Sequence, residues 1–278
     1  MNHDPYQWGR PSNDTYGPYN YKIAQANNSE VKEHNNNHQF PKMNTQQPII
    51  TGTSVIASKF ANGIIMAADH VGSYGSLLRF NNLERLIKVG NETVVGISGD
   101  ISDLQYIKRL LEELEIQEEV YDNDGGNYLR APNVHEYLSR VMYNRRSKMD
   151  PLWNSIIVGG FDIDKKPFLK YVDLLGVTYH ASTIATGFGS HLAIPLLRNL
   201  IPEDKEYVKI QEDQVTKVVE DSMRVLFYRD ARSGEVYSYV IIKLVDNEIK
   251  FEFINDAKVE NQSWRFAKDI RGYASKQS

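Results

Sequence analysis

Two residues that could do chemistry together, Thr53 and Asp69, lie at the open ends of a predicted β-hairpin. Residues 53–59 and 64–68 are mostly small or branched, and Asn62-Gly63 between them favours a two-residue turn. Such a hairpin brings the start of its first strand to the end of its second. A threonine hydroxyl attacks a carbonyl only when a neighbouring group activates it. The sequence therefore places a potential nucleophile near an acid.

The elements that would position these side chains follow in a regular order. A glycine-rich turn is expected at 69–76, and strands at 83–89 and 93–98. Asp100 or Ser102 can cap the next helix, whose apolar face carries Leu104, Ile107 and Leu111. A second helix is expected from about Pro132. Further predicted elements are strands at 154–160 and 167–173, helices at 187–200 and 211–228, and strands at 236–245 and 249–253. This order predicts an α/β fold of two sheets packed face to face with helices outside, a four-layer αββα sandwich.

The chain divides by composition into a polar leader and a globular remainder. Residues 1–44 contain nine asparagines and few aliphatic residues, so they cannot bury enough apolar surface to offset the entropy lost on ordering. We interpret them as a disordered or removable segment, and His3, His34 and His38 in it as solvated. The 226 residues after Gly52 suit one α/β domain.

Composition also narrows the function. The 278 residues contain no cysteine, which excludes disulfides and thiolate metal sites. The net charge is −4, so no global basic field points to nucleic acid. No apolar run of transmembrane length is present. No cofactor or metal is expected.

Several segments together resemble one known family. They are GTS at 52–54, GIIMAAD at 63–69, SYGSLLRF at 73–80, GISGD at 96–100, RRSKMDPLWN at 145–154 and YRDARS at 228–233. From residue 52 onward the chain resembles a 20S proteasome beta subunit, with the N-terminal nucleophile hydrolase fold. It is most similar to the non-catalytic type that is numbered seventh in yeast and fourth in mammals.

The resemblance also indicates what the site lacks. Active members use a threonine with a free α-amine, an aspartate and a lysine, which correspond to Thr53, Asp69 and Arg85. The Arg85 guanidinium can pair with Asp69, but it cannot reproduce a compact ammonium, because it is planar and stays protonated in proteins. Two further departures are Val71, where active members have arginine, and Phe188, where they have serine. Asp230 and Ser233 match the supporting acid and serine, but they can also hold their own loop by local hydrogen bonds.

No nearby residue is expected to replace the lysine. Lys88 lies an odd number of residues from Arg85, so on a strand its side chain faces the other way. Lys59 shares a face with Thr53 but lies about 20 Å away by strand rise. His70 should point away from Asp69.

The resemblance implies how the chain matures and assembles. Without catalytic machinery Gly52–Thr53 should stay intact, and trimming is expected at Asn44–Thr45 by an active neighbour. Residues 45–52 would then remain as an extension ahead of the domain at 53–258, and residues 259–278 would form a C-terminal arm. The chain should close the proteolytic chamber within a heteromeric ring in ubiquitin-dependent degradation, in cytoplasm and nucleus. Contact candidates are residues 73–80 and 145–153, and an arm to the opposite beta ring carrying Trp264, Phe266, Ile270 and Tyr273. The alternative for Trp264 and Phe266 is that they fold back onto their own domain. The alternatives are an active threonine peptidase with Thr53 as nucleophile, and a cofactor-free amidohydrolase that needs the same free residue.

Overall fold

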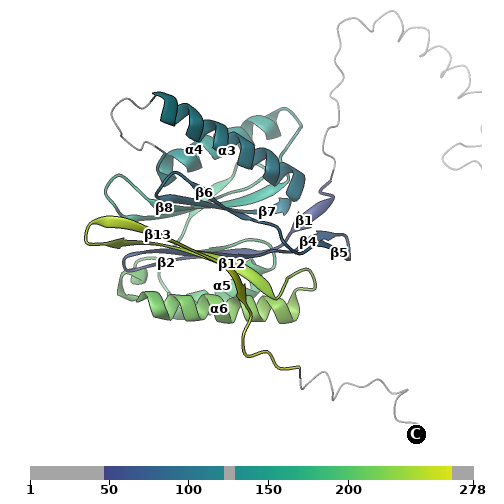
Figure 1. Ribbon diagram of the computed structural model, residues 1–278, viewed down its shortest axis with the longest axis vertical. Coiled ribbons are helices and arrows are strands. Elements are labelled where there is room, and N and C mark those ends of the chain that lie inside the picture. The colour runs from purple at the N-terminus through teal and green to yellow at the C-terminus, as the bar shows by residue number, and fades with distance from the viewer. Residues whose placement is uncertain (1–46, 122–128, 265–278) are drawn as a thin grey trace, which may run out of the picture. The chain divides into compact units, whose positions relative to one another are not determined.

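The computed structural model describes residues 47–121 and 129–264. Figure 1 shows two stacked β-sheets, with helices α3 and α4 outside one and helices α5 and α6 outside the other. The predicted four-layer αββα sandwich is therefore confirmed. No helix of the described residues is long and apolar enough to cross a membrane.

The first sheet contains eight strands and is built around the middle of the chain. Its order is β10-β9-β8-β7-β1-β4-β5, and β6 pairs with β7 outside this path. The bounds are β1 Ile50–Gly52, β4 Gly72–Tyr74, β5 Leu77–Phe80, β6 Leu86–Val89, β7 Thr93–Asp100, β8 Asn154–Phe161, β9 Pro167–Val172 and β10 Thr178–His180. It is covered by α3 (Ile101–Tyr121) and α4 (Ala131–Ser147).

The second sheet contains five strands in the order β11-β2-β3-β12-β13. The bounds are β2 Val55–Phe60, β3 Gly63–Asp69, β11 Thr183–Ala185, β12 Val236–Val245 and β13 Glu248–Lys258. It is covered by α5 (Gly189–Leu200) and α6 (Glu212–Arg229), and a 3-10 turn, η1, spans Glu206–Lys209. The predicted hairpin is confirmed as β2 and β3, which pair from Val55↔Ala68 to Phe60↔Gly63.

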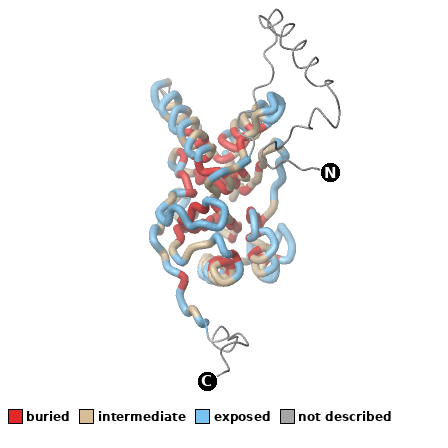
Figure 2. Tube along the Cα trace, turned by 90° about the vertical axis from the view of Figure 1, so that its right-hand side faces the viewer, coloured by how far each residue is buried: buried red, intermediate tan, exposed pale blue. Residues whose placement is uncertain are grey.

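The layer between the sheets is apolar and closely packed. Buried side chains of both sheets meet there, and Figure 2 shows buried residues along the middle of the molecule and exposed ones outside. Two glycines let the sheets approach. A Cβ on Gly96 would lie 2.6 Å from the Met66 sulfur, and one on Gly159 would lie 2.4 Å from Ile64 Cδ1. These close contacts fix how the two sheets pack around residues 55–69, which carry the candidate site.

The structure corrects several element boundaries. The stretch 69–76, predicted as a turn, contains strand β4 and leads into β5, and only Gly75 has the left-handed backbone of a turn, with φ +59°. The strand predicted at 83–89 begins at Leu86, and the one predicted at 53–59 begins at Val55. Strands β1, β10 and β11 were not predicted, because three residues are too few to show an alternating pattern.

Of the two residues that were predicted to cap the first helix, Asp100 is the one that caps α3, which begins at Ile101. The Asp100 carboxylate accepts the Asp103 N–H at 3.1 Å, as an N-cap does, and its other oxygen accepts the Ile49 N–H at 2.9 Å. The same side chain therefore holds the start of α3 and the chain that enters β1.

Candidate active site around Thr53

Thr53 lies where the chain passes from one sheet to the other. Strand β1 ends at Gly52 in the eight-stranded sheet, where Gly52 pairs with Gly99 and Thr51 pairs with Asp100 and Ser73. Strand β2 begins at Val55 in the five-stranded sheet. The Gly52–Thr53 peptide bond is therefore part of a continuous chain that is held by strand pairing on both sides.

The Thr53 hydroxyl is held by an acidic residue that lies far from it in the sequence. It donates a hydrogen bond to Asp230 Oδ2 at 2.5 Å. Asp230 is buried at the end of α6, and its other oxygen accepts the Arg232 N–H at 3.0 Å. The predicted supporting acid is thus beside Thr53.

Arg85 occupies the centre of the site and is 1% exposed. Its Nη2 pairs with Asp69 Oδ1. Its other hydrogen bonds go to backbone carbonyls: Nε to Asp69 at 2.9 Å, Nη1 to Thr53 at 2.8 Å and Nη2 to Ser54 at 3.0 Å. The predicted pairing with Asp69 is confirmed. The guanidinium also ties together the residues on both sides of the β1–β2 connection, which sequence reasoning missed.

The Arg85 side chain packs directly against Gly52. A Cβ at Gly52 would lie 2.5 Å from Arg85 Cδ, far closer than such atoms approach in proteins. Gly52 is therefore required here by the buried arginine, independently of any processing at the following bond.

Asp69 is buried, but hydrogen-bond donors surround its carboxylate. Burial raises the pKa of its carboxyl, while the Arg85 guanidinium and the Val71 N–H act in the opposite direction. Its Oδ2 accepts N–H groups of Val71 at 3.1 Å and Gly234 at 3.2 Å. Because a guanidinium and two N–H donors face it, we assign Asp69 as ionised at neutral pH.

The remaining predicted positions serve local structure. Ser233 Oγ lies 2.9 Å from the Leu226 carbonyl and 2.8 Å from the Asp230 carbonyl, as expected for a loop-holding hydroxyl. The Phe188 side chain is 57% exposed, at the start of α5. Val71 is buried and would contact a Cβ on Gly234 at 2.6 Å. The Thr53 hydroxyl is hydrogen-bonded to Asp230 and to none of these three side chains.

A serine that the sequence analysis did not consider anchors the α5 loop. Ser54 Oγ accepts the Gly189 N–H at 2.8 Å, and Gly187 beside it has φ +57°. The adjacent hydroxyl of Thr186 accepts the Val55 N–H at 2.8 Å. The segment Gly187-Phe188-Gly189 could have indicated this contact, because glycines on both sides of a residue let the backbone approach another segment closely.

The three possible substitutes for the lysine lie elsewhere. Lys59 Nζ is 5.4 Å from the ring centre of Tyr207, and Lys88 Nζ is 5.0 Å from that of Phe251. His70 Nε2 lies 2.6 Å from Ser238 Oγ, directed away from the site. Burial lowers the pKa of both Lys59 and His70. None contacts Thr53, which agrees with the prediction.

Several predicted features lie outside the described residues, namely the bond Asn44–Thr45, the histidines of residues 1–44, and Phe266, Ile270 and Tyr273. Trp264 is described, and it packs edge-on against its own domain, with ring centres 5.9 Å from Phe227 and 5.0 Å from Tyr228. In the described ranges no group of acidic residues and histidines is arranged to hold a metal ion.

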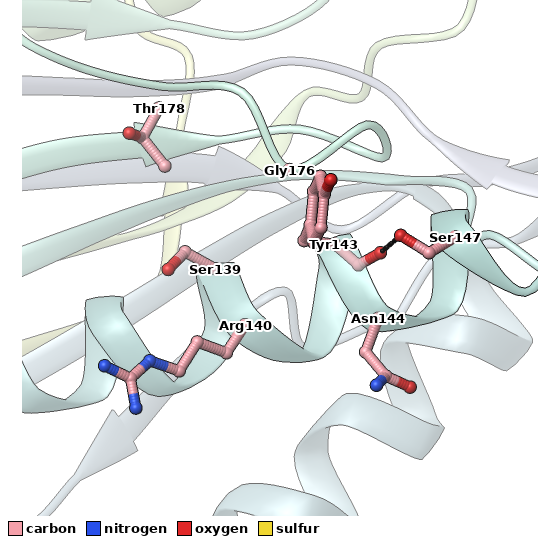
Figure 3. A pocket seen from close by; sticks show the side chains of 7 residues that line it. All are labelled: Ser139, Arg140, Tyr143, Asn144, Ser147, Gly176 and Thr178. Atoms are coloured by element: carbon pink, nitrogen blue, oxygen red, sulfur yellow. Dashed lines mark hydrogen bonds between the residues drawn. The ribbon is translucent and has the colours of Figure 1, made fainter.

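A surface pocket of about 430 Å³ lies along helix α4 and shares no residue with the Thr53 site. Figure 3 shows its lining side chains, most of them from one side of α4. Both serine hydroxyls here are bonded locally, since Ser139 Oγ donates to the Glu136 carbonyl at 2.9 Å and Ser147 Oγ donates to the Tyr143 carbonyl at 2.8 Å. The two serines therefore serve the local structure of α4.

Comparison with known proteins places this geometry in context. A family model described as "Proteasome subunit" matches residues 49–242. Proteasome subunit beta type-7 of Saccharomyces cerevisiae is 52% identical over 99% of both chains. A probable proteasome subunit beta type-7 of Schizosaccharomyces pombe is 45% identical, over 96% of this chain and 95% of the relative. Proteasome subunit beta type-4 of Xenopus laevis is 44% identical, over 84% of this chain and 92% of the relative.

Proposed function

Because the chain belongs to the proteasome subunit family, in which it is a beta subunit, we propose that it is a non-catalytic member of the 20S core. The observation that carries this proposal is the buried Arg85. At the position where active relatives use a lysine, its donors are committed to Asp69 and to the carbonyls of Thr53 and Ser54. Its role is to fix the backbone around the former nucleophile.

The chemistry of Thr53 supports the same proposal. An N-terminal threonine acts as a nucleophile because its own amine, or a lysine beside it, takes the hydroxyl proton. In the uncut chain the Thr53 nitrogen is in a peptide bond with Gly52, the last residue of β1, and β1 is paired on both edges. The hydroxyl donates to Asp230 instead. A free amine would require cutting the chain at the end of a strand that the sheet holds.

One observation favours the alternative of an active threonine peptidase. The 2.5 Å contact between Thr53 Oγ1 and Asp230 Oδ2 places a carboxylate where a base could stand. A peptidase would still need a free amine on Thr53 and a cation that can move at the site. Arg85 is held in place and supplies neither. The amidohydrolase alternative has the same requirement. We therefore place both below the non-catalytic proposal.

The N-terminus of the mature chain distinguishes these functions. We expect the intact mass of the subunit in purified particles to correspond to residues 45–278, because the Gly52–Thr53 bond stays uncut. Mass spectrometry of the dissociated particle, with N-terminal sequencing, measures this directly. A chain that begins at Met1 would refute removal of the leader, and one that begins at Thr53 would refute the non-catalytic assignment.

The proposed work of the chain is to close the chamber and to seat neighbouring subunits, and the β4–β5 hairpin supports it. All four residues of β5 are exposed, so neither face of this edge strand is covered. Leu77 and Leu78 point to opposite faces and are 58% and 57% exposed. Exposed apolar patches of this kind mark protein contacts. The described residues offer no cover for them within the chain.

Replacing both leucines is expected to impair assembly without unfolding the chain. The variant Leu77→Ser/Leu78→Ser removes apolar area that only a partner can bury, so its share in the assembled particle should fall several-fold below wild type in a co-expression competition. Quantitative mass spectrometry of tagged chains in the particle measures that share. Ile163→Ser is the matched control, because Ile163 is 79% exposed in the β8–β9 turn. Equal incorporation of the double variant and this control would exclude the hairpin as a contact.

The other parts of the proposal rest on the family resemblance. The C-terminal arm from residue 259 would extend to the opposite beta ring. The described part of it is held on its own domain by Trp264 and by the Ser263 N–H, which donates to the Tyr228 hydroxyl at 2.6 Å. Any reach to a second ring would therefore start after Trp264. The proposed location is the cytoplasm and nucleus, as for the assembled core.

A further inference from the structure

The surface pocket along helix α4 is lined by hydrogen-bond donors, and none of its described lining residues carries a carboxylate. Besides the two serines, helix α4 contributes Arg140, Tyr143 and Asn144, and the chain after β9 contributes Gly176 and Thr178. Arg140 is the charged member of this set, and Figure 3 shows its guanidinium standing clear of the other labelled side chains. A pocket with this lining fits an anion.

A second guanidinium lies at the edge of the pocket. Arg146 Cζ is 5.6 Å from the ring centre of Tyr143, and no carboxylate of the described residues forms an ion pair with it. Arg140 pairs with Glu136 one helical turn away, through Nε at 2.8 Å. Both side chains of that pair are exposed, and such a surface pair is weak enough to be exchanged for another carboxylate. The pocket therefore has positive charge that the described chain does not fully neutralise.

The turn at residues 173–177, between β9 and β10, is fixed against α4. Asp173 Oδ1 accepts the N–H groups of Leu175 and Val177, each at 2.9 Å. Gly176 has φ +78°, and a Cβ there would lie 2.9 Å from Tyr143 Cβ, so the turn packs directly on the helix. The wall of the pocket is thus held in place before any ligand binds, which lowers the entropy cost of binding.

The side chains beside the pocket form an apolar rim, which we define as Tyr143, Leu175 and Val177. They are 57%, 48% and 55% exposed. Leu175 and Val177 flank Gly176 in the turn, and Tyr143 packs under it. Exposed apolar side chains next to arginine and tyrosine are typical of protein interfaces. An inorganic anion would leave this rim in water, so the rim indicates a protein ligand.

We propose that the pocket along α4 binds an acidic side chain of a neighbouring subunit, from a segment whose apolar residues cover the rim. The carboxylate accepts charge-assisted hydrogen bonds from the guanidinium groups of Arg140 and Arg146, and the Asn144 amide and the Thr178 hydroxyl are further donors. A small anion would match the charge alone, and a purely apolar partner would match the rim alone. An acidic segment with apolar neighbours matches both.

This inference rests on the proposed role in assembly, and its test is independent of catalysis. Because either guanidinium can hold the carboxylate, both are removed together in Arg140→Gln/Arg146→Gln. Lys166→Gln/Lys217→Gln is the control, since it changes the net charge equally at exposed positions before β9 and on α6. In a co-expression competition, the share of the pocket variant in purified particles should fall roughly tenfold, while that of the control stays near wild type. Equal shares would overturn the proposal.

Glu136→Gln separates recognition of charge from the stability of helix α4. It breaks the same surface pair as the loss of Arg140 but leaves both guanidinium groups in place. Its share in the particle should therefore equal or exceed that of wild type, because Glu136 no longer competes for Arg140. A fall as large as that of the double arginine variant would trace the loss to the helix itself and overturn the proposal.

A map of the wild-type particle provides a measurement that does not depend on how the variants fold. We expect a carboxylate of a neighbouring chain within hydrogen-bond distance of Arg140 or Arg146, and the apolar rim covered by the same chain. A pocket open to solvent, or one that holds an inorganic anion only, would overturn the proposal. Labelling at Thr53 would refute the non-catalytic function while leaving this contact unchanged, so the two failures can be told apart.

Discussion

Replacing Arg85 with methionine is expected to remove this chain from the assembled particle almost completely. Arg85 is 1% exposed, and its loss would leave the Asp69 carboxylate buried without its counter-ion. It would also leave three backbone carbonyls without their donors. Breaking a buried ion pair by removing one partner costs about 3–5 kcal/mol. Because domains are stable by only about 5–15 kcal/mol, the variant should lose a large part of its free energy of unfolding.

Two further variants make this expectation specific. Arg140→Met removes an exposed arginine that pairs with Glu136 one helical turn away, and should cost only about 0.3–0.5 kcal/mol. Asp69→Asn/Arg85→Met removes both buried charges and should recover part of the loss. Incorporation of tagged chains and the thermal stability of the purified particles are the measurements. If Arg85→Met were tolerated as well as Arg140→Met, the buried pair would not support the site.

Gly99→Ala is the second substitution with a large expected effect. Gly99 has φ +98° and pairs with Gly52 directly before Thr53. A Cβ there would lie 2.1 Å from the Trp153 carbonyl oxygen, a backbone atom that cannot turn aside. Backbone strain of about 1–3 kcal/mol would be added to this clash, so a total loss of about 3 kcal/mol or more is expected.

Gly75→Ala is the control for backbone conformation alone. Gly75 also has positive φ, +59°, but an added Cβ would meet no atom within 4 Å. Its cost should therefore be about 1–2 kcal/mol, the penalty of a left-handed residue. Thermal unfolding of particles that carry each variant compares the two. Equal losses for Gly99→Ala and Gly75→Ala would show that close packing against Trp153 is unimportant.

The sequence predicted the parts of the fold whose signals are local and repeated. Asn62-Gly63 identified the β2–β3 hairpin, and Asp100, one of the two predicted cap residues, caps α3. Strand β13 was predicted to end near Phe253. The strand continues to Lys258, since the ribbon absorbs the positive φ of Asp256 with a register shift between Tyr237 and Tyr239.

The site was predicted in its residues but only partly in its contacts. The pairing of Asp69 with Arg85 follows from opposite charge at matching positions. That Arg85 also binds the carbonyls of Thr53 and Ser54 depends on where the chain changes sheets, which the three-residue strand β1 determines.

Reactivity of Thr53 toward a threonine-directed epoxyketone tests the central claim most directly. Such a probe requires both a nucleophilic hydroxyl and a free amine on the same threonine. In intact particles, the catalytic subunits should be labelled and serve as the internal positive control, while this chain should remain unlabelled at saturating probe. Peptide mapping by mass spectrometry reads out each subunit separately. We predict an unmodified Thr53 in a peptide that still contains Gly52, and a covalent adduct on Thr53 would contradict the non-catalytic assignment.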